Sequence, residues 1–181
     1  MDKGSQIYGW SCAAASLLYS TLGDGEKALE LLRAHNNNRI FVMPNTMYIE
    51  YFPVIECSLF AAKSLQDMLI QSWGDCIRIF PAMPSEWKES LFYDLRAEGA
   101  FLVSAFRNNG TTSWVKIKSL AGEPCKVRPG FTGDFSSSLS SININETEPG
   151  VFEIGLKKGE EIILFQEPFD LSSEKPVEIS N

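Results

Sequence analysis

Glu56 is the side chain of this sequence best placed for acid–base chemistry, because it stands at the start of a long amphipathic run. Apolar residues recur behind it at three- and four-residue spacing, which predicts a helix over 57–73 that ends at Gly74. A carboxylate there can interact with the free N–H groups and the helix dipole, or it can take a proton from water. The residue types leave both roles open. The residues of the predicted apolar stripe are Leu59, Ala62, Leu65, Met68, Leu69 and Ser72.

Two tryptophans, Trp10 and Trp73, are candidate substrate-binding residues. A flat indole suits the apolar face of a pyranose ring, and the alternative is that both rings fill the core between helices. Trp87 is expected to connect the helical part to the strands that follow it. Glu50 and Asp67 are expected to be surface carboxylates or to support a site without touching substrate.

Other reactive residue types lack the context that chemistry needs. His35 follows a predicted helix end, where it can bond terminal carbonyl groups. Ser11 has no Gly-x-Ser-x-Gly surroundings, so a nucleophilic serine is not predicted. The four cysteines contain no C-x-x-C pair and the chain has one histidine, so no tetrahedral metal site is predicted. Scattered on apolar segments, the cysteines are expected to be small core residues rather than disulfides.

Composition narrows the class of protein. The chain has 181 residues, 44% of them hydrophobic, which suits one ordinary domain or pieces of two. Its formal net charge is -7 and it has no basic patch, so a nucleic-acid partner is not expected. The sequence contains no run of about 18 apolar residues, so no membrane span is predicted. Residues 1–5 lack the apolar region of a signal peptide.

The first third of the chain is predicted to be helical. Residues 10–22 are rich in alanine and leucine and stop at Gly23, and Asp24 can cap a second helix over 26–34. The short link predicts an antiparallel helical hairpin. Residues 39–53 are expected to form a long loop, with a short strand at 40–43.

After Gly74 the apolar period changes towards two, which indicates strands. Asn109-Gly110 predicts a hairpin turn, because both residues tolerate positive φ. Residues 151–156 and 162–165 are expected to pair as a final hairpin, and 135–145 to form a surface loop. The other predicted strands are at 77–79, 101–105, 114–118 and 125–127.

These elements predict an α+β fold, in which N-terminal helices precede an antiparallel β-sandwich. The predicted division is helices in 1–88, the β-sandwich in 89–168 and a loose tail in 169–181.

Three blocks of the sequence resemble glycoside hydrolase family 95, the alpha-L-fucosidase-like enzymes. The first is Gly9-Trp10-Ser11 with the turn Leu22-Gly23-Asp24-Gly25. The second runs from Glu56 to Trp87 and includes Leu-Ile-Gln-Ser-Trp-Gly and Pro-Ala-Met-Pro. The third begins at Leu95 and resembles the start of the family's C-terminal β-domain. The resemblance implies the last helices of an (α/α)6 barrel followed by a β-sandwich.

The resemblance also implies a mechanism. Enzymes of this type invert configuration: one carboxylic acid protonates the leaving oxygen and a carboxylate activates water on the other face. The family's base is an aspartate in an Ile-Asp-Gly-Asn-Phe-Gly motif, and counting back from Gln71 places Glu56 at that position. The chemistry needs no metal or cofactor. The general acid would belong to helices before Met1, so this chain alone is expected to be inactive.

The sequence departs from the family around this position. Cys57 and Ser58 replace the motif's glycine and asparagine, and residues 50–52 replace His-Pro-Pro. Ala14 and Ala15 stand where the family has an aromatic residue and a lysine. The sugar and the linkage therefore stay open.

The expected function is that of a C-terminal fragment of an inverting glycosidase acting on an oligosaccharide or glycan. Two alternatives stay open: a non-catalytic carbohydrate-binding or structural β-sandwich module, and an interaction protein that dimerises through its helical half. Three helices taken from a barrel would expose an apolar flank, so a homo-oligomer is expected. Localisation is open, and the resemblance implies a secreted or periplasmic parent.

Overall fold

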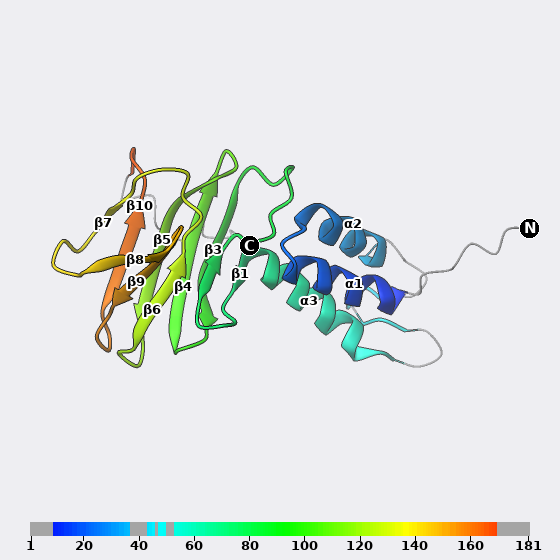
Figure 1. The fold of residues 1–181 in the computed structure, drawn as a ribbon. Helices are drawn as coiled ribbons and strands as arrows, with labels where there is room; N and C mark the ends of the chain where they lie inside the picture. Colours follow the sequence, from blue (N-terminus) through cyan, green and yellow to red (C-terminus); the bar gives the residue numbers. More distant parts are fainter. Residues whose placement is uncertain (1–8, 37–42, 46, 50–52, 170–181) are drawn as a thin grey trace, which may run out of the picture. The chain divides into compact units, whose positions relative to one another are not determined.

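The computed structural model describes residues 9–36, 43–45, 47–49 and 53–169, with the side chain of Trp10 excepted. The chain divides into two compact units (Figure 1). The helical unit takes the chain as far as Gln71 and again over Pro81–Glu86, and the β unit takes Ser72–Phe80 and the chain from Trp87 onward. The predicted α+β fold, with helices before a β-sandwich, is confirmed.

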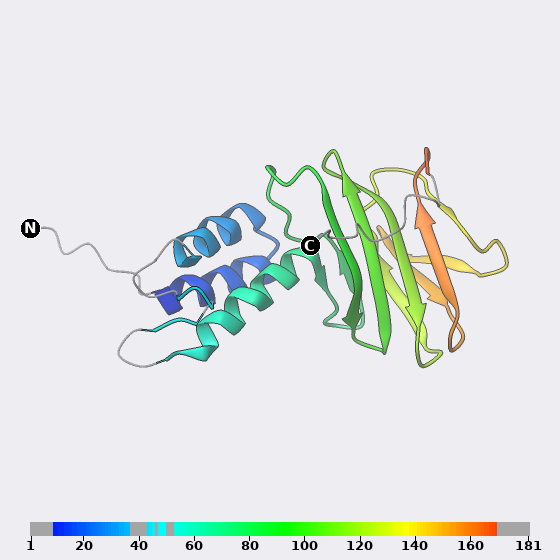
Figure 2. The ribbon, with the colours of Figure 1, turned by 180° about the vertical axis from the view of Figure 1, so that it is seen from behind.

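The predicted helical hairpin forms α1 (Gly9–Thr21) and α2 (Gly25–Asn36), which run side by side in opposite directions (Figure 2). Gly23 has φ +86°, the left-handed conformation that ends a helix. The backbone N–H of Lys27 donates to Asp24 Oδ1 at 3.0 Å, which is the predicted N-cap. The apolar stripe of α2 is buried as expected, with Ala28 and Leu32 among its members.

The segment Pro81–Glu86 packs against the start of α2. A Cβ atom on Gly25 would lie 2.3 Å from the carbonyl oxygen of Ala82, so only glycine allows this approach. The backbone N–H of Ser85 donates to Glu26 at 2.6 Å, and Arg33 forms an ion pair with Glu86. These contacts fix the segment to the helical unit.

The third helix, α3 (Ile55–Leu69), is shorter than predicted. The expectation of helix as far as Trp73 was wrong, because Ile70 is extended at φ −150° and ψ 137° and begins a two-residue strand, β1 (Ile70–Gln71). The Gln71 amide, which is buried, donates to the carbonyl oxygens of Ser20 and Asp67 at 2.8 and 3.0 Å. It thereby satisfies a terminal carbonyl of α1 and one of α3, which ends the helix before Gly74.

The buried face of α3 also differs from the predicted stripe. Met68 is buried as predicted, but Leu59 and Leu65 are exposed. Cys57 and Ser64, which are not part of the predicted stripe, are buried. Ser16 and Ser64 share a 2.6 Å hydrogen bond between their hydroxyl groups, and Ser16 also donates to the carbonyl oxygen of Ala28. Small polar residues at these positions let the helices approach closely, so the apolar period identifies only part of the inner face.

The β unit is a sandwich of two sheets. One has the strand order β3–β4–β5–β10–β7 and the other the order β2–β6–β9–β8. The second sheet lies in front in Figure 1 and behind in Figure 2. All pairings are antiparallel except β2 with β6. The strands are β2 (Ile77–Ile79), β3 (Ser90–Ala97), β4 (Phe101–Asn108), β5 (Thr111–Ser119), β6 (Pro124–Arg128), β7 (Ser136–Ser137), β8 (Ile144–Glu148), β9 (Val151–Gly155) and β10 (Glu161–Phe165).

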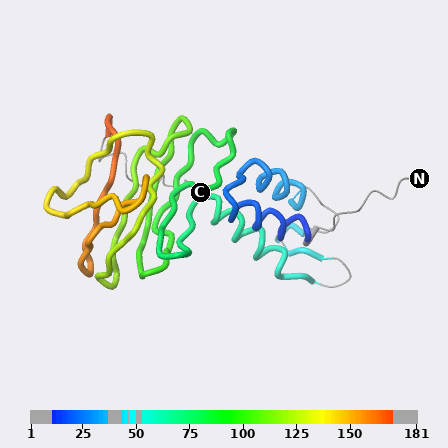
Figure 3. The backbone as a smooth tube through the Cα atoms, in the orientation of Figure 1, coloured from blue at the N-terminus to red at the C-terminus, as the bar shows by residue number. Residues whose placement is uncertain are grey.

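One predicted hairpin is confirmed and another is wrong. Asn109 and Gly110 both have positive φ and join β4 to β5. In contrast, β9 and β10 do not pair: β9 lies between β6 and β8, and β10 lies between β5 and β7. The chain crosses from one sheet to the other after Gly155 (Figure 3), so Ile154 and Ile162 enter the core from opposite sheets. Alternation identifies two strands but not the sheet to which each belongs.

Three strands of the β unit fall outside the expectations: β3, β8 and the short β7, which lies inside the predicted surface loop 135–145 and pairs with β10. In β3 the alternation is interrupted at Asp94, which has φ +50° and whose backbone N–H bonds the Ser104 hydroxyl at 2.9 Å. Residues 144–148 are polar and extend from the predicted loop, yet they pair along β9 as β8. The predicted strand at 40–43 lies mostly outside the described residues, as does the tail beyond residue 169.

Candidate functional site

Glu56 occupies the first turn of α3 and its side chain is exposed. The residue before the helix, Val54, makes no side-chain hydrogen bond to the helix end. The carboxylate therefore stands in the first turn of the helix, where the helix dipole favours negative charge. Both roles considered for Glu56, interaction with the helix end and acceptance of a proton from water, require a position at the start of the helix.

A small apolar cluster supports the start of α3. It consists of Tyr48, Val54 and Cys57, which are all buried. The backbone N–H of Val54 donates to the Tyr48 carbonyl at 2.8 Å, and the Tyr48 ring lies 5.4 Å from the ring of His35. His35 is thus a buried residue that packs at this end of the unit. The adjoining residues 50–52, which include Glu50, lie outside the described part of the chain.

Glu56 differs from every other carboxylate described in the helical unit. It forms no hydrogen bond or ion pair with any described residue, whereas the other five each have a partner. Those five, each with its partner, are Asp24 with Lys27, Glu26 with Ser85, Glu30 with Lys27, Asp67 with Lys63 and Glu86 with Arg33. A carboxylate that bonds no protein group is free to bond a water molecule or a substrate hydroxyl.

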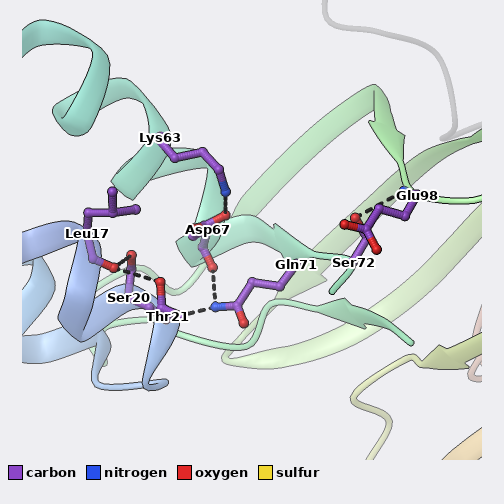
Figure 4. Close-up of polar contacts among 8 residues, drawn as sticks. All are labelled: Leu17, Ser20, Thr21, Lys63, Asp67, Gln71, Ser72 and Glu98. Atoms are coloured by element: carbon purple, nitrogen blue, oxygen red, sulfur yellow. Dashed lines mark hydrogen bonds and ion pairs between the residues drawn. The ribbon is translucent and has the colours of Figure 1, made fainter. Parts of the chain in front are cut away.

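Asp67 is buried at the opposite end of α3 (Figure 4). Its carboxylate forms an ion pair with Lys63, and its carbonyl oxygen accepts from Gln71. Eleven residues separate it from Glu56, which at 1.5 Å per residue is about 16 Å along the helix axis. Two carboxylates of an inverting glycosidase lie about 6.5–9.5 Å apart, so Asp67 cannot be the partner of Glu56.

The two candidate tryptophans lie in different units. Trp10 belongs to α1, and its side chain is outside the described part of the structure. Trp73 belongs to the β unit and is 51% exposed, so the alternative that it fills a helix–helix core was wrong. The Arg78 guanidinium lies 3.9 Å from the centroid of the Trp73 ring and donates to the Trp73 carbonyl at 2.7 Å. The ring is held in place by this contact while half of its surface stays open.

In the β unit, Ser72 accepts a 3.1 Å hydrogen bond from the backbone N–H of Glu98 (Figure 4).

The sequence gives no signal for two sets of contacts in the helical unit, those of Gln71 and of the Ser16–Ser64 pair. Both depend on contacts between residues far apart in the chain.

The four cysteines are buried and free, as expected. Burial raises the pKa of the Cys125 thiol to about 12, with a smaller contribution from Cys76, and burial also raises the pKa of Cys12. Thiols with raised pKa values are poor nucleophiles. In the described part of the chain, no group of three histidine, cysteine or acidic residues is arranged to hold a metal ion.

None of the described helices is long and apolar enough to cross a membrane.

The chain thus joins a helical unit, in which Glu56 has no described partner, to a β-sandwich. The comparison with protein families identifies the class: residues 71–164 match the model for the C-terminal domain of glycoside hydrolase family 95. This match covers just over half of the 181 residues, and the chain belongs to glycoside hydrolase family 95. It lies almost entirely in the β unit, and Glu56 stands outside it. The comparison with curated proteins gave no match.

Proposed function

We propose that this chain is the C-terminal part of an inverting, alpha-L-fucosidase-like glycoside hydrolase and that Glu56 is its general base. The observation that carries the proposal is that Glu56 alone, among the described carboxylates of the helical unit, has no partner. Family membership supplies the reaction class, the cleavage of a glycosidic bond by water.

In this proposal Glu56 accepts a proton from a water molecule while that water attacks the anomeric carbon. The side chain of Glu56 is exposed in the first turn of α3, so a water molecule can reach the carboxylate. Tyr48, Val54 and Cys57 hold the first turn of α3 and so fix the position of the base. An accurate position matters, because an error of about 1 Å in placing the reacting groups can cost about a hundredfold in rate.

The reaction also needs an acid on the other side of the bond. The remaining described carboxylates of the helical unit are engaged, and Asp67 is too far along α3. From the resemblance to the family we assign the acid to a part of the enzyme outside this chain, and the isolated chain is expected to show no turnover. No metal or cofactor has a role in this mechanism.

The test is Glu56→Gln in the complete enzyme, assayed on 2′-fucosyllactose. The amide keeps the shape of the side chain but cannot take the proton, so kcat is expected to fall by about two to four powers of ten, with an unchanged melting temperature. Glu30→Gln is the matched control, because Glu30 is exposed and pairs with Lys27 on the surface of α2. Full activity of Glu56→Gln would remove Glu56 from the mechanism.

A second candidate function is self-association through the helical unit. Leu18 on α1 and Leu22, in the turn that follows α1, are 65% and 79% exposed, and on α3 Leu59 is 60% exposed. These exposed side chains are apolar surface of the helical unit that has no described partner. A second copy of the chain could cover this surface, which would make the protein a homo-oligomer.

A further inference from the structure

The β unit contains a hollow that is separate from Glu56. It lies between the loop that follows β6 and the turn that joins β8 to β9, and its volume is about 350 Å³. Binding sites for small molecules have volumes of about 300–1,000 Å³ and combine apolar walls with a few polar groups. The residues of the hollow used below are Arg128, Phe131, Gly133, Phe135, Gly150 and Phe152.

Three phenylalanine rings form its apolar wall. The centroid of Phe135 lies 5.1 Å from that of Phe131 and 4.8 Å from that of Phe152, the second pair in an edge-to-face arrangement. All three side chains are partly exposed, although the sandwich core fully buries larger residues such as Trp114. A cluster of aromatic surface that a well-packed unit leaves open is typical of a binding site.

The loop that carries Phe131 is held firmly against the sheet. Gly130 has φ +74°, and a Cβ atom there would lie 3.1 Å from the Thr112 hydroxyl and 3.3 Å from the Ile79 carbonyl oxygen. The opposite wall is open, because a Cβ atom on Gly150 would meet no atom within 4 Å. The hollow is therefore preformed on one side and unobstructed on the other.

Arg128 supplies the polar part. Its side chain is exposed, and it forms no ion pair or hydrogen bond with any residue that the structure describes. None of the described residues that line the hollow is a carboxylate. A guanidinium group presents several N–H donors in a flat fork, which suits two adjacent hydroxyl oxygens.

We propose that this hollow is a second, non-catalytic glycan-binding site, in which a pyranose ring lies on the phenylalanine wall and Arg128 donates to two vicinal hydroxyl groups. A pyranose fits because it combines an apolar C–H face with adjacent hydroxyls at its edge. The site goes beyond the proposed catalytic function and does not depend on Glu56. Its role is to hold a glycan chain near the enzyme while the bond is cleaved elsewhere.

The test is binding by the 181-residue chain, which needs no turnover. Saturation-transfer NMR and calorimetric titration with 2′-fucosyllactose and with cellotetraose are expected to detect binding of at least one of them. Phe131→Ala and Arg128→Gln should each weaken that binding at least tenfold. Arg128→Gln tests the site even if Phe131→Ala disturbs the loop, because Arg128 is exposed.

Phe106→Ala is the control, since Phe106 is a partly exposed phenylalanine on β4 that does not line the hollow. It should bind as the parent does, and so should Glu56→Gln. The proposal is overturned if neither oligosaccharide binds at 10 mM, a concentration about tenfold above the upper end of common KM values, or if both hollow variants bind as tightly as the parent. Loss of turnover in Glu56→Gln with intact binding would separate the two sites.

Discussion

The helical unit and the β unit distribute their side chains differently. Of eight large apolar residues that the described chain exposes, six lie in the helical unit, and of nine buried polar residues, six lie there as well. The exposed six are Leu18, Leu22, Met43, Ile55, Leu59 and Leu65. The buried six are Ser16, Ser20, His35, Ser64, Asp67 and Gln71.

In the β unit, fewer large apolar residues are exposed and fewer polar residues are buried. Its centre is a continuous apolar core in which Trp114, Ile154 and Leu164 are almost completely inaccessible. Such a core lets a unit fold by itself, because apolar burial is the main favourable term in folding. The helical unit also buries apolar residues such as Leu32 and Met68, but it adds buried polar residues between its helices and leaves several leucines exposed.

The largest expected effect is the difference in lost stability between two substitutions, one at a core residue of the β unit and one at an exposed residue of the helical unit. Trp114→Ala should lower the free energy of unfolding of the β unit by about 3–5 kcal/mol, because it removes a fully buried aromatic side chain. Leu22→Ala, at a side chain that is 79% exposed, should change stability by less than about 0.5 kcal/mol. Chemical denaturation followed by amide NMR signals of each unit measures both. Equal losses would contradict the distinction between the units.

A smaller effect concerns the local opening of each unit, which can be measured from the rate at which its free cysteines are labelled. Cys12 and Cys57 lie in the helical unit and Cys125 lies in the β unit, where the raised pKa of about 12 also suppresses thiolate formation. In native buffer at pH 8, Cys12 and Cys57 should react with a thiol reagent at least tenfold faster than Cys125, because the less apolar unit opens more readily. Mass spectrometry of the labelled chain locates each modification. Faster labelling of Cys125 would reverse the comparison.

The smallest effect tests the exposed leucines as an association surface. A double change, Leu18→Glu with Leu22→Glu, places charge on α1 and on the turn that follows it. If the chain self-associates through this face, the apparent mass at high concentration should fall to that of the monomer. Light scattering measures the mass, and Leu91→Glu on β3 serves as the control because Leu91 is exposed in the β unit. A parent chain that is already monomeric would remove the homo-oligomer proposal.

Local signals predict much of the fold. Gly23 with Asp24 marks the link between α1 and α2, and Asn109-Gly110 marks the turn between β4 and β5, because each depends on residues adjacent in sequence. The end of α3 is not predictable in this way, since Gln71 bonds the carbonyl of Ser20, which is 51 residues away. The separation of β9 and β10 into different sheets also depends on distant pairings.

The candidate site shows the same limit. The position of Glu56 at a helix start is predictable from the spacing of the residues behind it. Its lack of a partner is not, because the other carboxylates are engaged partly by distant groups: Arg33 bonds Glu86 across 53 residues and Ser85 bonds Glu26 across 59. The aromatic hollow depends on Phe131, Phe135 and Phe152 meeting at one end of the sandwich, which no period in the sequence indicates.

The most direct test of Glu56 as the base uses azide with the complete enzyme carrying Glu56→Ala and 4-nitrophenyl alpha-L-fucoside as substrate. Azide has no proton to lose, so it can attack the anomeric carbon from the position of the water as the bond to 4-nitrophenolate breaks. We expect azide to restore the rate of nitrophenolate release and to form the β-configured fucosyl azide, identified by NMR. A variant that azide does not rescue, or one that yields the α-configured azide, would contradict the assignment of Glu56.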